Sequence, residues 1–204
     1  YKKLHILINN AGLIISEKSL TKDGIESTFA INHLGYFLLT NLLLDLMKSS
    51  APARIVNVAS DAHKMGHIDF DDLNYENKKY STMKAYGSSK LANILFTKEL
   101  AKRLQGTNIT VNCVHPGAVN SNFGSNTKGI MGIVSKIIKP FFISAEKGAE
   151  TQIYLATSPE LEGVTGEYFV KKKIEQPNSE ARDENIAKRL WEVSEKMTHI
   201  KNKA

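Results

Sequence analysis

Short apolar runs alternate with longer stretches in which apolar residues recur at helical spacing. Each short run ends in polar or turn-forming residues, which is typical of a strand buried on both faces. The predicted strands are 4–8, 54–59, 109–114 and 167–170. The predicted helices are 22–48, 83–105, 146–156 and 183–197, the first of them with Thr21 as its N-cap. The polar segment 61–81 shows no long periodic pattern and is predicted to be a loop or an insertion.

Strands that alternate with helices of this length indicate βαβ units and therefore an α/β protein with a parallel sheet. In open sheets of this kind, ligands bind beyond the carboxyl ends of the strands. Asn10, Ser60 and Pro116 each lie at the end of a predicted strand. We therefore expect these three residues on the same edge of the sheet.

Tyr86 and Lys90 lie four residues apart on a predicted helix, which makes their side chains neighbours. A free tyrosine has a pKa near about 10 and is a poor base at neutral pH. A lysine about 4 Å away would favour the phenolate by roughly 4 kcal/mol at an effective dielectric constant of about 20. That attraction would bring the pKa of Tyr86 toward the working pH, where acid–base catalysis is most efficient. By itself the spacing also fits an ordinary surface pair.

Two further polar residues each have a structural and a functional interpretation. The Ser60 hydroxyl can orient a substrate oxygen over the tyrosine, or it can cap a helix or turn. Asn32 lies in an otherwise apolar helical stretch, with Gly35 three residues on. A mid-helix asparagine usually points to solvent. The alternative is a buried amide that holds an ordered water or a carbonyl of a neighbouring helix.

The turns after the first and third predicted strands also have a structural and a functional interpretation each. The Asn-Asn-Ala-Gly sequence at 9–12 is an ordinary strand-ending turn, or a turn that lets a flat cofactor approach the backbone. Pro116-Gly117 is a rigid strand exit, or an exit shaped to contact a nicotinamide ring.

Composition narrows the class of protein. With 204 residues, 42% of them hydrophobic, the chain can bury one substantial core. The formal net charge of +6 is scattered, which favours a solvated surface over a nucleic-acid footprint. Cys113 is the single cysteine, which excludes an internal disulfide and fits a reducing compartment. His63 and His67 have Asp61 and Asp69 nearby, but no cysteine or third histidine joins them, so a metal site is not expected.

These residues together resemble the short-chain dehydrogenase/reductase family. The matching elements, in the family's order, are Asn9-Asn10-Ala11-Gly12, Asn32 with Gly35, Ser60, Tyr86-x-x-x-Lys90 and Pro116-Gly117. The likeness covers nearly the whole chain, and the retinol dehydrogenase subgroup is the most similar part of the family. The segments that carry this second likeness are 54–60, 88–96, 190–194 and the polar insertion between Ser60 and Tyr86.

The resemblance implies one domain over 1–204 with a Rossmann-like, doubly wound parallel sheet that is incomplete at its N-terminal side. It implies hydride transfer between a nicotinamide cofactor and an alcohol or carbonyl carbon. Tyr86 would be the acid or base, Lys90 would lower its pKa and bind the nicotinamide ribose, and Ser60 would orient the substrate oxygen. Asn32 would hold the water through which Lys90 relays protons. The residues implied to line the cofactor are Asn10, Ala11, Gly12, Tyr86, Lys90, Pro116, Gly117, Val119 and Ser121, where the family usually has threonine at the last position.

One departure from the family is large. Its glycine-rich phosphate-binding loop is expected before strand 4–8, and no such glycine cluster occurs in the 204 residues. We expect the first three strands, roughly 60 to 80 residues, to precede this chain and to form one side of the sheet. The 204-residue chain alone should then expose the edge of its first strand and apolar helix faces, bind cofactor poorly and aggregate. NADP is the expected cofactor, and NAD stays open because the residues that distinguish the two follow the second of these strands.

The segment 117–145 is predicted to be a substrate lid. Its apolar residues, among them Ile133 and Ile137, recur at helical spacing beside lysines, which fits a packed helix or an apolar lid that touches a membrane surface. A small lipophilic alcohol or aldehyde, such as a retinoid, would suit this lid. A catalytically silent binding protein on the same fold, and a reductase for another carbonyl class, are the alternatives.

The expected partners are therefore a small-molecule substrate and no nucleic acid, with membrane-surface contact and a homodimer both compatible with the sequence. The expected location is the cytoplasm or a cytosol-facing membrane. No membrane-spanning segment is predicted, because the apolar stretch 36–47 is short and interrupted by polar residues.

Overall fold

The computed structural model describes residues 2–119 and 143–200. Its centre is a five-stranded sheet in the order β1-β2-β3-β4-β5. The strands are β1 (Ile6–Asn9), β2 (Ala53–Val58), β3 (Ile109–His115), β4 (Tyr168–Val170) and β5 (Lys173–Ile174). The first four are parallel to one another and β5 is antiparallel to β4. The predicted parallel sheet and the α/β class are confirmed.

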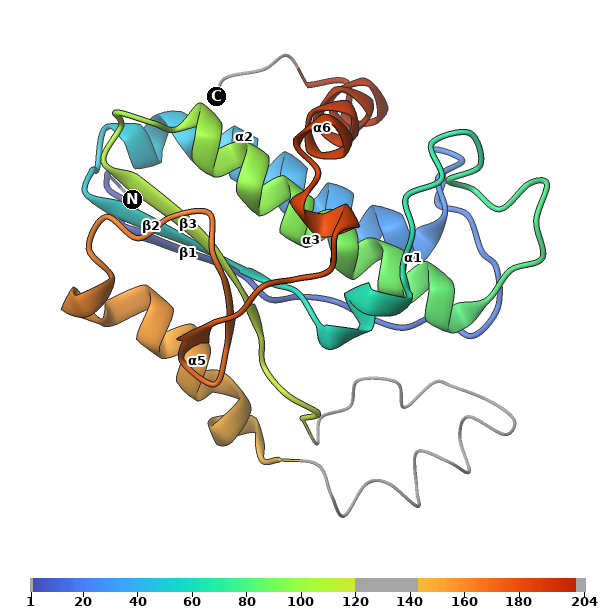
Figure 1. Cartoon of the computed structure of the whole chain (residues 1–204). Helices are drawn as coiled ribbons and strands as arrows, with labels where there is room; N and C mark the ends of the chain where they lie inside the picture. Colours follow the sequence, from blue (N-terminus) through green and yellow to red (C-terminus); the bar gives the residue numbers. More distant parts are fainter. Residues whose placement is uncertain (1, 120–142, 201–204) are drawn as a thin grey trace.

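Helices cover both faces of this sheet, as the doubly wound class requires. The α-helices are α1 (Ser27–Phe29), α2 (Gly35–Lys48), α3 (Thr82–Arg103), α5 (Ala145–Thr157) and α6 (Glu184–Thr198). A π-helical segment η1 (Ala30–Leu34) joins α1 to α2. The 3-10 turns are η2 (Asp61–Met65), η4 (Pro159–Leu161) and η5 (Glu180–Arg182). Figure 1 shows α2, α3 and α6 on one face of the sheet and α5 on the other.

The core is divided between these two faces. Alternate residues of a strand point to opposite sides, so Ile55 of β2 packs beneath α2 and α3 whereas Val56 packs against α5. The larger side is built around three aromatic rings. Phe37 lies 4.9 Å from Trp191 and 5.6 Å from Phe96, measured between ring centroids. Ring contacts therefore pack helix α6 against α2 and α3.

The first long helix begins later than the sequence predicts. The helical stretch starts at Ser27, and its N-cap is Glu26, whose carboxylate accepts hydrogen bonds from the backbone of Thr28 and Phe29 at 2.8 and 2.7 Å. The prediction of Thr21 as the N-cap was wrong. Its hydroxyl instead closes a tight turn that contains Gly24, whose φ of +76° does not fit a helix.

Two of the short elements that were not predicted are η2 and β5. The turn η2 lies inside the polar segment that was predicted as a loop, and β5 follows a turn in which Lys171 and Lys172 both have positive φ, at 49° and 64°. Lysines carry no sequence signal for that backbone conformation, which favours glycine or asparagine. The C-terminal strand pair was therefore not visible in the residue pattern.

The side of the sheet at β1 exposes apolar groups, as predicted. β1 is an edge strand, and Ile6 and Ile8 on it are each 41% exposed. On α2, Leu39 and Leu42 are exposed as well.

The continuous helix Ser27–Ser49 is longer than the apolar stretch considered in the sequence, and by length and composition it could span a membrane. Half of its most apolar window is buried inside this fold, so the helix serves here as a core element.

Candidate active site

The carboxyl ends of β1, β2 and β3 form one edge of the sheet, because the three strands run parallel and in register. Asn10 directly follows β1, Ser60 lies two residues beyond β2, and Pro116 directly follows β3. The structure therefore brings the three strand-end residues to the same edge, as the sequence predicts.

The polar residue Asn9 anchors this edge from within the core. Its side-chain amide donates to Thr40 at 2.9 Å and to Asn57 at 2.8 Å, and Asn57 in turn donates to Thr97 at 2.9 Å. This chain of buried hydrogen bonds ties the end of β1 to β2 and to both neighbouring helices. The first asparagine of the 9–12 turn is thus a buried structural group, whereas Asn10 and Ala11 are exposed.

Tyr86 and Lys90 lie on α3, buried beneath the same edge. The tyrosine is 8% exposed and the lysine 2%. The Lys90 ammonium lies 5.7 Å from the centre of the Tyr86 ring and donates to the carbonyl of Val58, at the end of β2, over 3.1 Å. The pair is therefore a buried one, which removes the interpretation as a surface pair.

Ser60 combines the two roles that the sequence left open. Its hydroxyl caps η2 by accepting a hydrogen bond from the backbone of Ala62 at 3.2 Å. The same side chain is hydrogen bonded to the Tyr86 hydroxyl, a contact that lowers the pKa of the tyrosine. The two hydroxyl groups thus converge at the strand edge, where a single substrate oxygen could contact both.

Two glycines allow η2 to sit directly on α3. A side-chain carbon on Gly87 would lie only 2.7 Å from the carbonyl oxygen of Ala62, and one on Gly66 would lie 2.4 Å from the carbonyl carbon of Gly87. Because no larger residue fits at either position, the backbones of the turn and the helix are in contact. This contact brings Ser60, two residues before Ala62, next to Tyr86, the residue before Gly87.

Asn32 is fully buried inside the π-helical segment, which excludes the solvent-facing interpretation. Its amide nitrogen donates to the carbonyl of Leu13 at 2.9 Å and to the hydroxyl of Ser89 at 3.0 Å, and its oxygen accepts from the backbone nitrogen of Leu13 at 2.9 Å. The side chain therefore binds the turn after β1 to α3. The implied role in holding a water molecule stays a prediction.

Burial governs the protonation of the two central groups. It raises the pKa of Tyr86 to about 12, an effect that the hydrogen bond with Ser60 partly offsets. It lowers the pKa of Lys90 to about 7. The expectation that Lys90 brings the pKa of Tyr86 toward neutrality was therefore wrong for this structure, because desolvation disfavours both the phenolate and the ammonium. At neutral pH Tyr86 carries its proton.

The two strand-exit turns present small residues to this pair. A side-chain carbon on Gly12 would lie 3.2 Å from the Asn32 side-chain oxygen and 3.4 Å from the Lys90 nitrogen. Gly117 has a φ of +91°, and Val119 forms a β-bridge with Ile143. Ser121 and most of the predicted lid, including Ile133 and Ile137, lie outside the described residues.

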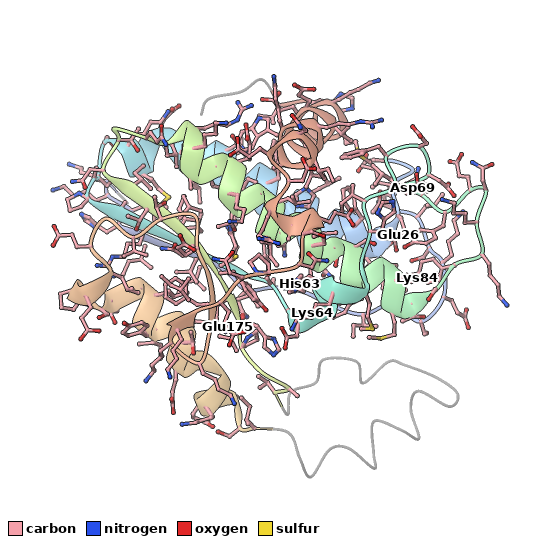
Figure 2. The ribbon with its side chains drawn as sticks, viewed as in Figure 1. Glu26, His63, Lys64, Asp69, Lys84 and Glu175 are labelled. Atoms are coloured by element: carbon pink, nitrogen blue, oxygen red, sulfur yellow. The ribbon has the colours of Figure 1, made fainter. Side chains whose placement is uncertain are left out.

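A cavity of about 300 Å³ lies beside this site, between the polar segment after η2 and the helices α1 and α3. Its lining mixes apolar side chains such as Phe29 and Ile68 with the charged residues Glu26, Asp69 and Lys84, which Figure 2 labels. Neither Ser60 nor Tyr86 lines it, so it is separate from the converging hydroxyl groups. Among the described residues, no group of three histidine, cysteine or acidic side chains could hold a metal ion.

The chain is similar to known dehydrogenases over most of its length. A family model described as short chain dehydrogenase matches residues 1–129. Retinol dehydrogenase 14 of Homo sapiens is 52% identical over 204 residues, which cover 97% of this chain and 60% of that protein. Retinol dehydrogenase 13 of Homo sapiens is 49% identical, over 98% of this chain and 62% of its own length. This chain thus spans about 60% of the length of these curated relatives.

Solved structures agree with this likeness. An uncharacterised protein from Mycobacterium paratuberculosis superposes with a TM-score of 0.77 at 30% identity, covering 100% of this chain and 70% of that one. A short chain dehydrogenase from Salmonella enterica serovar Typhi superposes with a TM-score of 0.59, at 20% identity, over 83% of this chain and 63% of its own. The second likeness shows the fold alone.

Proposed function

Because the chain belongs to the short-chain dehydrogenase family, we propose that the full-length gene product is a nicotinamide-dependent oxidoreductase that interconverts an alcohol and a carbonyl compound. The observation that carries this proposal is the hydrogen bond between Ser60 and Tyr86, held above a buried Lys90. A silent binding protein has no physical need for these three groups in contact at a strand edge.

The protonation state of the pair favours the reducing direction. Tyr86 carries its proton at neutral pH and can donate it to a carbonyl oxygen that the Ser60 hydroxyl holds in place. Lys90, with a pKa of about 7, can carry a proton near working pH and stabilise the charge that develops on the tyrosine as its proton leaves.

The site also suits the nicotinamide half of a cofactor. The Lys90 ammonium has three N–H donors and uses one of them on Val58, so it would have further donors for a ribose hydroxyl. Gly12 keeps the approach to this ammonium open, and Gly117 lines the opposite strand exit. When bound, a reduced nicotinamide supplies the hydride that reaches the carbonyl carbon. We propose NADP as the cofactor, with NAD as the competing outcome of the binding test.

The proposed substrate is a small lipophilic alcohol or aldehyde, with a retinoid as the first compound to test. The support comes from the names of the similar proteins, which are retinol dehydrogenases, and from the apolar spacing of the segment 117–145 in the sequence. We further propose that the protein works in the cytoplasm or at a cytosol-facing membrane surface.

Turnover by the purified full-length gene product tests this function. We expect NADPH-dependent reduction of all-trans-retinal, with NADPH preferred to NADH, and slower reduction of a short polar aldehyde. Binding of NADPH without turnover of any aldehyde or alcohol would instead support the silent binding protein. Rapid reduction of polar carbonyl compounds but not of retinal would support a different carbonyl class.

A further inference from the structure

His63 lies directly behind the residue that is proposed to hold the substrate oxygen. It is part of η2, three residues after Ser60, and its side chain is fully buried. Figure 2 shows it in this turn, next to Lys64 and below α3. The sequence alone offered His63 only as half of an improbable metal pair with His67.

Both nitrogens of the His63 ring have a defined role. Nδ1 lies 2.8 Å from the carbonyl oxygen of Ser60, which can only accept, so Nδ1 carries the hydrogen. Nε2 faces the backbone N–H of Asn178 at 3.4 Å, which can only donate, so Nε2 carries the lone pair. These contacts fix a neutral ring with its hydrogen on Nδ1. Burial lowers the pKa of His63, although Asp61 and Lys64 nearby act on it in opposite directions.

His63 therefore donates two hydrogen bonds to the carbonyl oxygen of Ser60. The backbone nitrogen of His63 donates to that oxygen at 3.0 Å, and the ring donates to it at 2.8 Å. A carbonyl oxygen has two lone pairs, and both are used. The plane of the peptide that leaves Ser60, and with it the direction of the Ser60 side chain, is held from two sides.

The N–H end of the same peptide, which belongs to Asp61, is held as well. The backbone nitrogen of Asp61 donates to the ring of His115 at 3.3 Å, and the Asp61 carboxylate accepts from the Tyr168 hydroxyl at 3.1 Å. The Tyr168 ring packs edge-on against His63, with 5.3 Å between the ring centroids. Ser60 is thus set within a frame built from β3, β4 and the segment that precedes η5.

We infer that His63 is a positioning residue: its Nδ1–H orients Ser60 so that the serine hydroxyl meets Tyr86 and the substrate oxygen together. The inference rests on the proposed oxidoreductase function. It assigns the effect to one nitrogen of the ring, because the bond to Asn178 leads away from Ser60 toward the C-terminal segment.

Two amide variants separate the nitrogens. The His63→Asn side chain can place an N–H near the position of Nδ1, whereas the His63→Gln side chain reaches the position of Nε2 and loses the donation to Ser60. We expect His63→Gln to lower kcat for aldehyde reduction about tenfold or more, and His63→Asn to retain kcat within about threefold of the wild type. The dissociation constant of NADPH should change little in both variants, because neither nitrogen faces the strand-exit turns.

A double variant excludes a merely structural role. If His63 acts through Ser60, then adding His63→Gln to the Ser60→Ala variant should lower kcat by less than about twofold, since the group that it orients is already absent. A loss of stability would instead reduce kcat to the same extent in both backgrounds. The tautomer is tested directly by two-bond ¹H–¹⁵N correlation spectra, in which His63 should appear neutral with its hydrogen on Nδ1 between pH 7 and 8.

The outcomes are distinct from those that test the function itself. A wild-type protein that turns over no carbonyl or alcohol overturns the proposed function, and the inference with it. An active wild type in which the glutamine and asparagine variants lose equal activity overturns the inference alone, as does a His63 ring with its hydrogen on Nε2. An active wild type with the expected difference between the variants supports both.

Discussion

Gly12 lies directly over the ammonium group of Lys90: a carbon added at Gly12 would be 3.4 Å from the lysine nitrogen and 3.2 Å from the Asn32 oxygen. The two residues come from the first strand exit and from α3, which are 78 residues apart in the chain. Because Gly12 has no side chain, the turn after β1 can approach the buried lysine nitrogen this closely.

Gly12→Val should therefore block the approach to Lys90. A single added carbon is already tight, so the branched valine must displace Asn32 or cover the ammonium group. We expect NADPH to bind at least about tenfold more weakly in this variant, measured by isothermal titration calorimetry. Gly12→Ala should lose about threefold or less. Unchanged binding in the valine variant would remove Gly12 from the cofactor site.

Gly87→Ala should loosen η2 from α3. The new methyl group would lie 2.7 Å from the Ala62 carbonyl oxygen, which is backbone and cannot move alone. We expect a loss of about 2 kcal/mol or more in the free energy of unfolding, measured by urea denaturation. Gly35→Ala is the matched control, because its methyl group meets only one backbone oxygen, at 3.7 Å, and should be neutral or stabilising by up to about 1 kcal/mol. Equal effects of the two substitutions would show that the glycine contact does not set the spacing.

Lys90→Met should stabilise the protein while it removes activity. Burial lowers the pKa of Lys90 from 10.5 to about 7, so the unfolded chain binds this proton more tightly than the folded one. The free energy of unfolding therefore decreases as the pH falls from 10.5 toward 7. Methionine does not titrate, so the variant does not lose this stability. The Val58 carbonyl keeps a second donor, Asn93, at 3.1 Å. We expect Tm at pH 7 to rise by on the order of 5 °C. A fall in Tm would mean that the ammonium group is better solvated than its burial indicates.

Stability should decline in mild acid because of His33. This residue is fully buried, with its Nε2 atom 2.9 Å from the Ser194 hydroxyl, and burial lowers its pKa from 6.5 to about 3. The unfolded state therefore takes up the proton first, and stability falls from pH 6.5 downward until the pH approaches 3. Between pH 7 and 5 we expect a loss of about 2 kcal/mol from this residue.

His33→Gln tests that assignment, since the amide can replace the contact with Ser194 but does not titrate. Urea unfolding at pH 5 and pH 7 should give a smaller difference for the variant than for the wild type. The remaining slope would come from His63 and His115, whose pKa values burial also lowers. An identical slope in both proteins would place the acid sensitivity elsewhere.

The parts of the fold that the sequence predicts best are those with uniform burial. β2 and β3 are buried on both faces and read as continuous apolar runs, and α3 and α6 were predicted to within two residues at each end. The start of the first long helix was missed because Glu26 rather than a hydroxyl residue caps it. The π-helical segment could not be recognised from the spacing of hydrophobic residues.

In the candidate site, too, some features could be predicted from the sequence and others could not. Parallel strands must end at one edge, so the placement of Asn10, Ser60 and Pro116 on that edge could be predicted from their order alone. The protonation state of Lys90 could not be predicted, because it depends on burial. The sequence shows that this residue can carry a charge but not that it is removed from water. His63 was missed because one of its two partners, Asn178, lies 115 residues away.

Proton transfer by Tyr86 is examined with the Tyr86→Phe variant of the full-length gene product. The ring remains to pack against Lys90, so the fold and the nicotinamide pocket should be retained. We expect kcat/KM for retinal reduction to fall by about a thousandfold or more, while the dissociation constant of NADPH stays within about threefold of the wild type. Reduction that persists at more than about a tenth of the wild-type rate, with cofactor binding intact, would contradict proton transfer by Tyr86.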